Sequence, residues 1–217
     1  MTRVVIFDCD GTLVDGQAAI CDTMDEAFAA AKLPAPDRNE VRRMVGLSLP
    51  QALRLLAPDA DEEQHAVALE AYKTGYRERR MSGTLEEPLY DGMAALIERL
   101  ADAGWLLGVA TGKSDRGLHA CLDTHGIKHR FVTLQTADRH PSKPHPAMLE
   151  EALGEAGAEA ANAVMIGDTT FDIEMARAAG VRAIGVAWGY HEPRELIAAG
   201  AVGVAQTMEE LEELING

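Results

Sequence analysis

The sequence predicts an α/β protein: a doubly wound parallel sheet with an inserted small helical cap domain. Strand-like apolar runs alternate with helical stretches from residue 88 onward, an order typical of parallel sheets with right-handed crossovers. A block of helical patterns, residues 16–83, separates the first strand from that region. We therefore expect a core domain of residues 1–15 and 84–217, and a cap of residues 16–83 that lies on the sheet. The 217 residues are enough for one such domain with a small insert.

The first strand is the apolar, β-branched run that begins at Val4 and ends abruptly at Asp8 and Asp10. These two acids lie on the same side of an extended chain, and Gly11 then breaks the strand. Two carboxylates held close repel each other, so they need a shared proton or a bound cation. The alternative is an ordinary turn at residues 10 and 11, capped by Asp8.

The insertion is expected to contain helices alone. The Ala-rich stretch 18–31 is a helix stopped by the prolines that follow it. Asp37 is a favourable N-cap for a second helix. A third, 49–56, starts after a serine with a proline in its first turn, and 62–80 is a long amphipathic helix.

The remaining core elements are predicted from the alternation of strand-like and helix-like hydrophobic patterns along the chain. Ligands of such sheets bind outside the carboxyl ends of the strands, and each polar cluster of this chain falls at such an end. The predicted strands are 105–111, 131–134, 163–168, 183–187 and a weak 201–205, and the predicted helices are 115–125, 147–156, 170–179, 195–199 and 208–215.

The formal net charge of −15 argues against nucleic acid and anionic membranes as partners, because both bind basic surfaces. An anionic substrate would then need local positive charge, supplied by a divalent cation and a few well-placed lysines or arginines. The cysteines, Cys9, Cys21 and Cys121, form no metal-binding or redox motif. Reduced thiols, no signal peptide and no spanning apolar run together predict a cytoplasmic protein, with a monomer as the default state.

Two further strand ends carry groups that suit a phosphate. Thr111-Gly112-Lys113 ends a strand just before a helix begins, so a hydroxyl, backbone amides and a helix N-terminus converge. Lys143 lies among three prolines, which stiffen the backbone around one cation. Each pattern alone is equally consistent with a turn or a surface linker.

Acidic residues also follow the strand 163–168. Asp168 lies at its end and Asp172 one helical turn later. Placed beside Asp8 and Asp10, Asp168 would complete an oxygen-rich site of the kind that Mg²⁺ prefers. An N-cap role for Asp168 is the simpler alternative.

Taken in order, these segments resemble the four motifs of the haloacid dehalogenase-like hydrolases. They are Asp-x-Asp-Gly-Thr from Asp8, an apolar strand ending in Thr111-Gly112, Lys-Pro-x-Pro from Lys143, and Gly-Asp-Thr-x-x-Asp ending at Asp172. The resemblance spans residues 8 to 172, and the predicted topology agrees with it over the whole chain.

The resemblance implies a role for each motif residue. Asp8 would be the nucleophile that forms an aspartyl phosphate, and Asp10 the general acid and base. Mg²⁺ would bind Asp8, the carbonyl of Asp10 and Asp168, with Asp172 orienting Lys143 or a metal-bound water. The groups expected to contact the phosphoryl moiety are Gly11, Thr111, Gly112 and Lys143.

The acid at Asp10 favours a phosphatase, because relatives that dehalogenate or cleave carbon–phosphorus bonds lack it. The insert resembles a C1-type cap, and residues 89–92 and 111–113 most resemble the phosphoglycolate phosphatase group. We therefore expect a Mg²⁺-dependent phosphatase that hydrolyses a small-molecule phosphate monoester, with 2-phosphoglycolate as one candidate. A sugar phosphomutase of the β-phosphoglucomutase type, a pyrophosphatase and a non-catalytic phosphate-binding module stay open.

Specificity is expected to lie in the cap. Arg42 and Arg43 precede Gly46, which would end a helix and aim this segment at the core site. An arginine there could bind a substrate carboxylate with two hydrogen bonds. A solvated helix face is the alternative for both.

Overall fold

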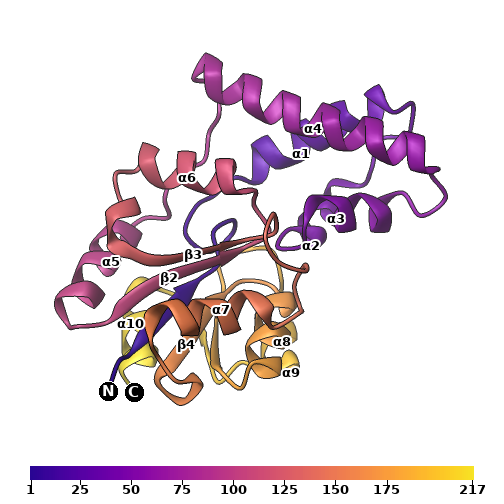
Figure 1. Cartoon of the computed structure of the whole chain (residues 1–217). Helices are drawn as coiled ribbons and strands as arrows, with labels where there is room; N and C mark the ends of the chain where they lie inside the picture. Colours follow the sequence, from indigo (N-terminus) through magenta and orange to yellow (C-terminus); the bar gives the residue numbers. More distant parts are fainter.

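The computed structural model describes residues 1–217, and its centre is a six-stranded parallel sheet (Figure 1). The strand order is β3-β2-β1-β4-β5-β6, so β1 lies between β2 and β4. This confirms the predicted doubly wound sheet. The strands are β1 (Val4–Phe7), β2 (Leu106–Thr111), β3 (Phe131–Thr136), β4 (Ala163–Gly167), β5 (Arg182–Val186) and β6 (Val204–Ala205).

Helices cover both faces of the sheet, so its central strand β1 is buried on both sides. Val5 and Phe7 of β1 pack into one apolar cluster, and Val4 and Ile6 pack into the other. The first cluster includes side chains of α5 (Met93–Asp102), α6 (Asp115–Thr124) and α10 (Met208–Asn216). The second includes side chains of α7 (Ala147–Ala156), α8 (Thr170–Ala178) and α9 (Pro193–Ala199).

The first four helices after β1 form the predicted helical insertion: α1 (Gln17–Ala30), α2 (Arg38–Met44), α3 (Leu49–Leu56) and α4 (Glu62–Ser82). Figure 1 shows them together on one side of the molecule, away from the two chain termini. They bury an apolar cluster of their own, which includes Met24, Phe28 and Leu53. The segment therefore has its own core, while domain boundaries at residues 15 and 84 stay a prediction. None of the helices is both long and apolar enough to cross a membrane.

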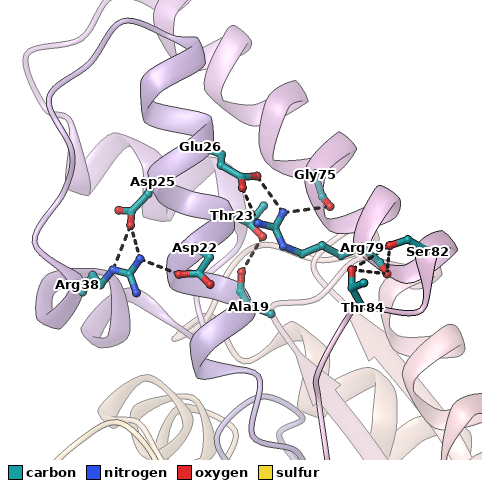
Figure 2. Close-up of polar contacts among 10 residues, drawn as sticks. All are labelled: Ala19, Asp22, Thr23, Asp25, Glu26, Arg38, Gly75, Arg79, Ser82 and Thr84. Carbon is teal, nitrogen blue, oxygen red and sulfur yellow. Dashed lines mark hydrogen bonds and ion pairs between the residues drawn. The ribbon is translucent and has the colours of Figure 1, made fainter.

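Ion pairs link α1 to α2 and α4 (Figure 2). Arg38 at the start of α2 reaches Asp22 at 2.7 Å and Asp25 at 2.6 Å, and Arg79 of α4 reaches Glu26 at 2.6 Å. Such partly exposed pairs each stabilise a fold by about 0–1 kcal/mol. They add little to the stability of the insertion, most of which comes from its buried apolar cluster.

The structure also contains a core helix that was not predicted. α5 begins after Gly92, whose φ is 84° and which offers no side-chain cap, so the usual start signal is absent from the sequence. Two short 3₁₀ turns, Lys128–Arg130 and Ala160–Asn162, precede β3 and β4. The weak last strand shrinks to two residues, Val204–Ala205.

Candidate active site

The predicted motif residues meet at one edge of the sheet. Asp8 directly follows β1, Thr111 ends β2, and Asp168 directly follows β4. Because β1 pairs in parallel with both neighbours, these three residues lie at adjacent strand ends. All three side chains are buried, so their charges and hydrogen bonds act in a region of low polarity.

A tight loop after Asp8 brings the first motif against Asp168. Gly11 has a φ of 79°, and a Cβ at this position would overlap the Asp168 carboxylate, so glycine is required both for conformation and for space. The Thr12 hydroxyl donates to Asp168 Oδ1 at 2.8 Å, and the Tyr190 amide donates to Oδ2 at 2.9 Å. The Asp168 carboxylate is therefore held from two sides.

Lys143 is a fully buried cation between two carboxylates. Its Nζ lies 2.9 Å from Asp8 Oδ1 and 2.6 Å from Asp172 Oδ1. Burial alone would lower the pKa of Lys143, but Asp172 and Asp8 hold it above its ordinary value. The other oxygen of Asp172 accepts from the amide and hydroxyl of Thr169, at 3.1 and 2.8 Å. Asp172 thus contacts the lysine that faces Asp8, consistent with one of the two roles that the family resemblance implied for it.

Asp8 carries a free oxygen. Its Oδ1 accepts from the Cys9 amide at 2.6 Å and contacts Lys143, whereas Oδ2 is buried without a hydrogen-bond partner. Burial raises the pKa of Asp8 to about 7, against the opposing charge of Lys143. Burial, with the charges of Asp172 and Asp8, also raises the pKa of Asp168 well above its ordinary value. A bound cation would relieve this concentration of negative charge.

The donor set suits a hard divalent cation. Oxygens of Asp8, Asp168 and Asp172 lie within 4.8 Å of one another. Carboxylate oxygens are the ligands that Mg²⁺ prefers, completed by water. Because Asp172 is paired with Lys143, the unpartnered Oδ2 of Asp8 and the carboxylate of Asp168 are the better placed of the three.

Asp10 belongs to a second buried network. Lys113 Nζ lies 2.9 Å from Asp10 Oδ1 and 2.6 Å from Glu87 Oε1, and the Tyr76 hydroxyl donates to the same Glu87 oxygen at 2.9 Å. Burial raises the pKa of Asp10, although Lys113 opposes that shift. Tyr76 lies on α4, so this network joins the insertion to the acid of the first motif.

Sequence reasoning predicted Asp10 but missed the other side chains of this second network, those of Lys113, Glu87 and Tyr76. Lys113 was noted only for its backbone amide, although its place directly after Thr111-Gly112 is a usable signal. Glu87 lies between α4 and α5 in a segment without periodicity. No sequence pattern marks it.

The end of β2 brings a hydroxyl close to a helix N-terminus and touches the cap. The Thr111 hydroxyl accepts from the Lys113 amide at 3.2 Å, which leaves its proton free to donate. Helix α6 begins directly afterwards. A Cβ on Gly112 would lie 2.7 Å from the carbonyl oxygen of Gly46, and closer still to that of Leu47. The cap loop therefore lies against the backbone of the second motif.

The structure places Arg42 and Arg43 away from the cavity of about 650 Å³ that opens onto Asp8 and Asp10. Arg43 pairs with Glu195 of α9 at 2.9 Å, and Arg42 donates to Asn39 at 2.9 Å. Gly46 does follow the end of α2 and faces the core, as expected. In this arrangement Arg43 joins the cap to the core.

Comparison with known proteins agrees with this geometry. Residues 5–186 match the family model described as haloacid dehalogenase-like hydrolase. The chain therefore belongs to the haloacid dehalogenase-like hydrolases. It is 36% identical to a probable phosphatase, IndB, of Dickeya dadantii over 97% of this chain and 92% of that protein. It is 30% identical to a phosphoglycolate phosphatase of Mesorhizobium japonicum, over 86% and 83% of the two chains.

A solved structure gives the same picture of the fold. The crystal structure of a predicted phosphatase from Clostridium acetobutylicum superimposes with a TM-score of 0.89 at 27% identity. The match covers 100% of this chain and 99% of that one. Core and insertion thus share one arrangement with that protein.

Proposed function

We propose that the protein is a Mg²⁺-dependent phosphatase that hydrolyses a small-molecule phosphate monoester through an aspartyl-phosphate intermediate. Its enzyme class is that of a phosphoric monoester hydrolase. The observation that carries the proposal is the carboxylate of Asp8, buried at a strand end with Oδ2 unpartnered and Lys143 on its other oxygen. The family and the phosphatase relatives support the same class of reaction.

In the first step an oxygen of Asp8 attacks phosphorus, and the bond from phosphorus to the ester oxygen breaks. Asp10 gives its proton to the departing oxygen. Burial favours a protonated Asp10 because it raises the pKa of that carboxyl, which suits a general acid. Lys143 favours the ionised form of Asp8 by charge pairing, against the effect of burial.

In the second step water attacks the phosphorus of the aspartyl phosphate. Asp10, now ionised, takes a proton from that water, and the bond from phosphorus to the Asp8 oxygen breaks. Inorganic phosphate leaves, and both acids return to their starting states. Lys113, held between Asp10 and Glu87, limits the positions that the Asp10 carboxylate can take.

Binding of the phosphoryl group falls to the ends of β1 and β2. We propose that Thr111 donates its hydroxyl proton, that backbone amides near Gly11 and Gly112 supply further donors, and that Lys143 neutralises charge. Phosphoryl transfer needs positioning and charge neutralisation above all. This set supplies both.

Mg²⁺ is the proposed cofactor. Asp8, Asp168 and the carbonyl of Asp10 would hold it, and Asp172 would act through Lys143. When bound, the ion would supply positive charge to the phosphoryl oxygens.

The substrate is proposed as a phosphate monoester of low molecular weight, and 2-phosphoglycolate is one candidate because relatives carry that name. Binding of a substrate carboxylate by Arg42 or Arg43 stays a prediction. For Arg43 it would require release from Glu195.

The test is phosphate release from a panel containing 2-phosphoglycolate, hexose phosphates and pyrophosphate, with Mg²⁺ or with a chelator. Wild type is compared with Asp8→Asn and with Asp59→Asn, an exposed cap position. We expect Mg²⁺-dependent release that Asp8→Asn abolishes and Asp59→Asn preserves. Release by Asp8→Asn at the wild-type rate would refute the proposal.

A further inference from the structure

The cavity over the candidate active site is much larger than a two-carbon acid requires. Its volume is about 650 Å³, within the range of pockets that hold drug-sized ligands. Asp8, Asp10, Thr111 and Gly112 form its floor. Its walls are formed by α1 to α4 with the loop after Met44, and on the core side by the start of α6 and residues 137–138. A substrate bound through its phosphate at the floor would direct its leaving group toward the cap.

The cap side of this cavity is apolar. Met24 of α1, Leu49 of α3 and Leu69 of α4 all line it. Tyr72 and Tyr76 line it as well, stacked with ring centroids 5.5 Å apart and an interplanar angle of 19°. Leu49, Leu69 and Tyr72 are only partly buried by the apolar cluster of the cap. Their remaining surface is available to a ligand.

Most cationic side chains of the cavity are already paired or exposed. The exception is Arg80, whose guanidinium lies over the Tyr76 ring and whose Nη2 is buried without a hydrogen-bond partner. Lys113 is already shared by Asp10 and Glu87, and Lys73 pairs with Glu70. Arg77 and Arg116 line the cavity as exposed side chains. They suit attraction of a dianion into a protein of net charge −15.

On these grounds, and resting on the proposed phosphatase function, we infer that the preferred substrate is a phosphate monoester of a bulky, largely apolar alcohol. An aromatic leaving group packed on Leu69 and Tyr72 fits best. Binding energy from such a remote group can be used to accelerate the chemical step. Burying a side-chain-sized apolar group raises kcat/KM by roughly 10- to 100-fold over a substrate that lacks it.

The experiment compares kcat/KM for 2-phenylethyl phosphate, ethyl phosphate and 2-phosphoglycolate with Mg²⁺. The first two are both alkyl esters and differ by one phenyl ring, so their ratio reports contacts of the ring. We expect 2-phenylethyl phosphate to exceed both others by at least about 10-fold, the lower end of that range.

Two variants of α4 place the effect in the cavity. Leu69→Gln puts a polar group on its wall and should lower the ratio of phenylethyl to ethyl phosphate several-fold. Val67→Gln, at a position 41% exposed on the same helix, should leave the ratio unchanged. Equal effects of both variants on this ratio would overturn the inference that the phenyl ring packs against Leu69.

The outcomes separate this inference from the function on which it rests. Turnover of all three esters with a ratio near one, or with 2-phosphoglycolate preferred, would overturn the inference and leave the phosphatase standing. Absence of release from every ester would overturn the phosphatase, and the inference with it.

Discussion

Replacing Lys143 by methionine tests the electrostatics of the candidate site most severely. The substitution keeps the length of the side chain and removes its charge. The Lys143 side chain has no exposed surface, and its Nζ contacts Asp8 at 2.9 Å and Asp172 at 2.6 Å. Without it, the carboxylates of Asp8, Asp172 and Asp168 share a buried site with no cation in the metal-free protein.

The magnitude follows from these contacts. Removing one partner of a buried ion pair destabilises a protein by about 3–5 kcal/mol. Proton uptake by the remaining carboxylates relieves part of this cost, and Asp8 already has a pKa raised to about 7 by burial. Each extra proton bound in the folded variant recovers about 1.36 kcal/mol per pH unit. Lowering the pH from about 8 to about 6 should therefore return up to about 2.7 kcal/mol.

The assay is urea unfolding with a chelator present at both pH values. Lys128→Met is the matched control, because Lys128 is a partly exposed lysine that pairs with Asp123, and it should cost less than about 1 kcal/mol. The double variant Lys143→Met with Asp172→Asn should be less destabilised than Lys143→Met alone. A cost of Lys143→Met below about 1 kcal/mol at the higher pH, or a cost that does not shrink at the lower pH, would refute the proposed electrostatic role of Lys143.

Three further predictions concern the metal, the cap contact and a buried histidine. Asp168→Asn should raise the Mg²⁺ concentration that gives half-maximal phosphate release by 10-fold or more, roughly the loss expected on removing a ligand group; an unchanged requirement would contradict its role. Gly112→Ala should displace the cap loop, since its Cβ would lie 2.7 Å from the carbonyl of Gly46, so turnover should fall while the core melts normally; unchanged turnover would show that the loop is free to move. Burial lowers the pKa of His191, so the unfolded chain binds a proton first and stability falls as the pH drops through about 6.5. His191→Gln should remove that part of the pH dependence in urea unfolding, and an identical pH profile would contradict it.

The strand ends of the site could be predicted because their signals are local. Asp8 and Asp168 each follow a short apolar run, and parallel strands place their carboxyl ends at one edge. The paired acids indicated a shared proton or a bound cation, and the stiff loop around Lys143 indicated a fixed positive charge. A phosphate and Mg²⁺ followed only from the resemblance of the four motifs taken together to a known family. The contacts of Lys143 with Asp8 and Asp172 agree with that reading.

Contacts between the cap and the core could not be read from local patterns. Arg43 meets Glu195, a residue 152 positions away in the sequence, and the direction of α2 decides whether it faces substrate or α9. Glu87 lies in a connecting segment, where no periodicity reports burial. Helix α5 was missed for a different reason, because Gly92 supplies no side-chain cap.

The most direct test of the account is to find the covalent intermediate on Asp8. The protein is mixed with Mg²⁺ and its best ester, quenched during turnover and treated with borohydride, which reduces an acyl phosphate to homoserine. We expect homoserine at position 8 by peptide mass spectrometry, in wild type with substrate and not without it. Phosphate release at full rate with aspartate intact at position 8, or with homoserine at Asp10 instead, would contradict it.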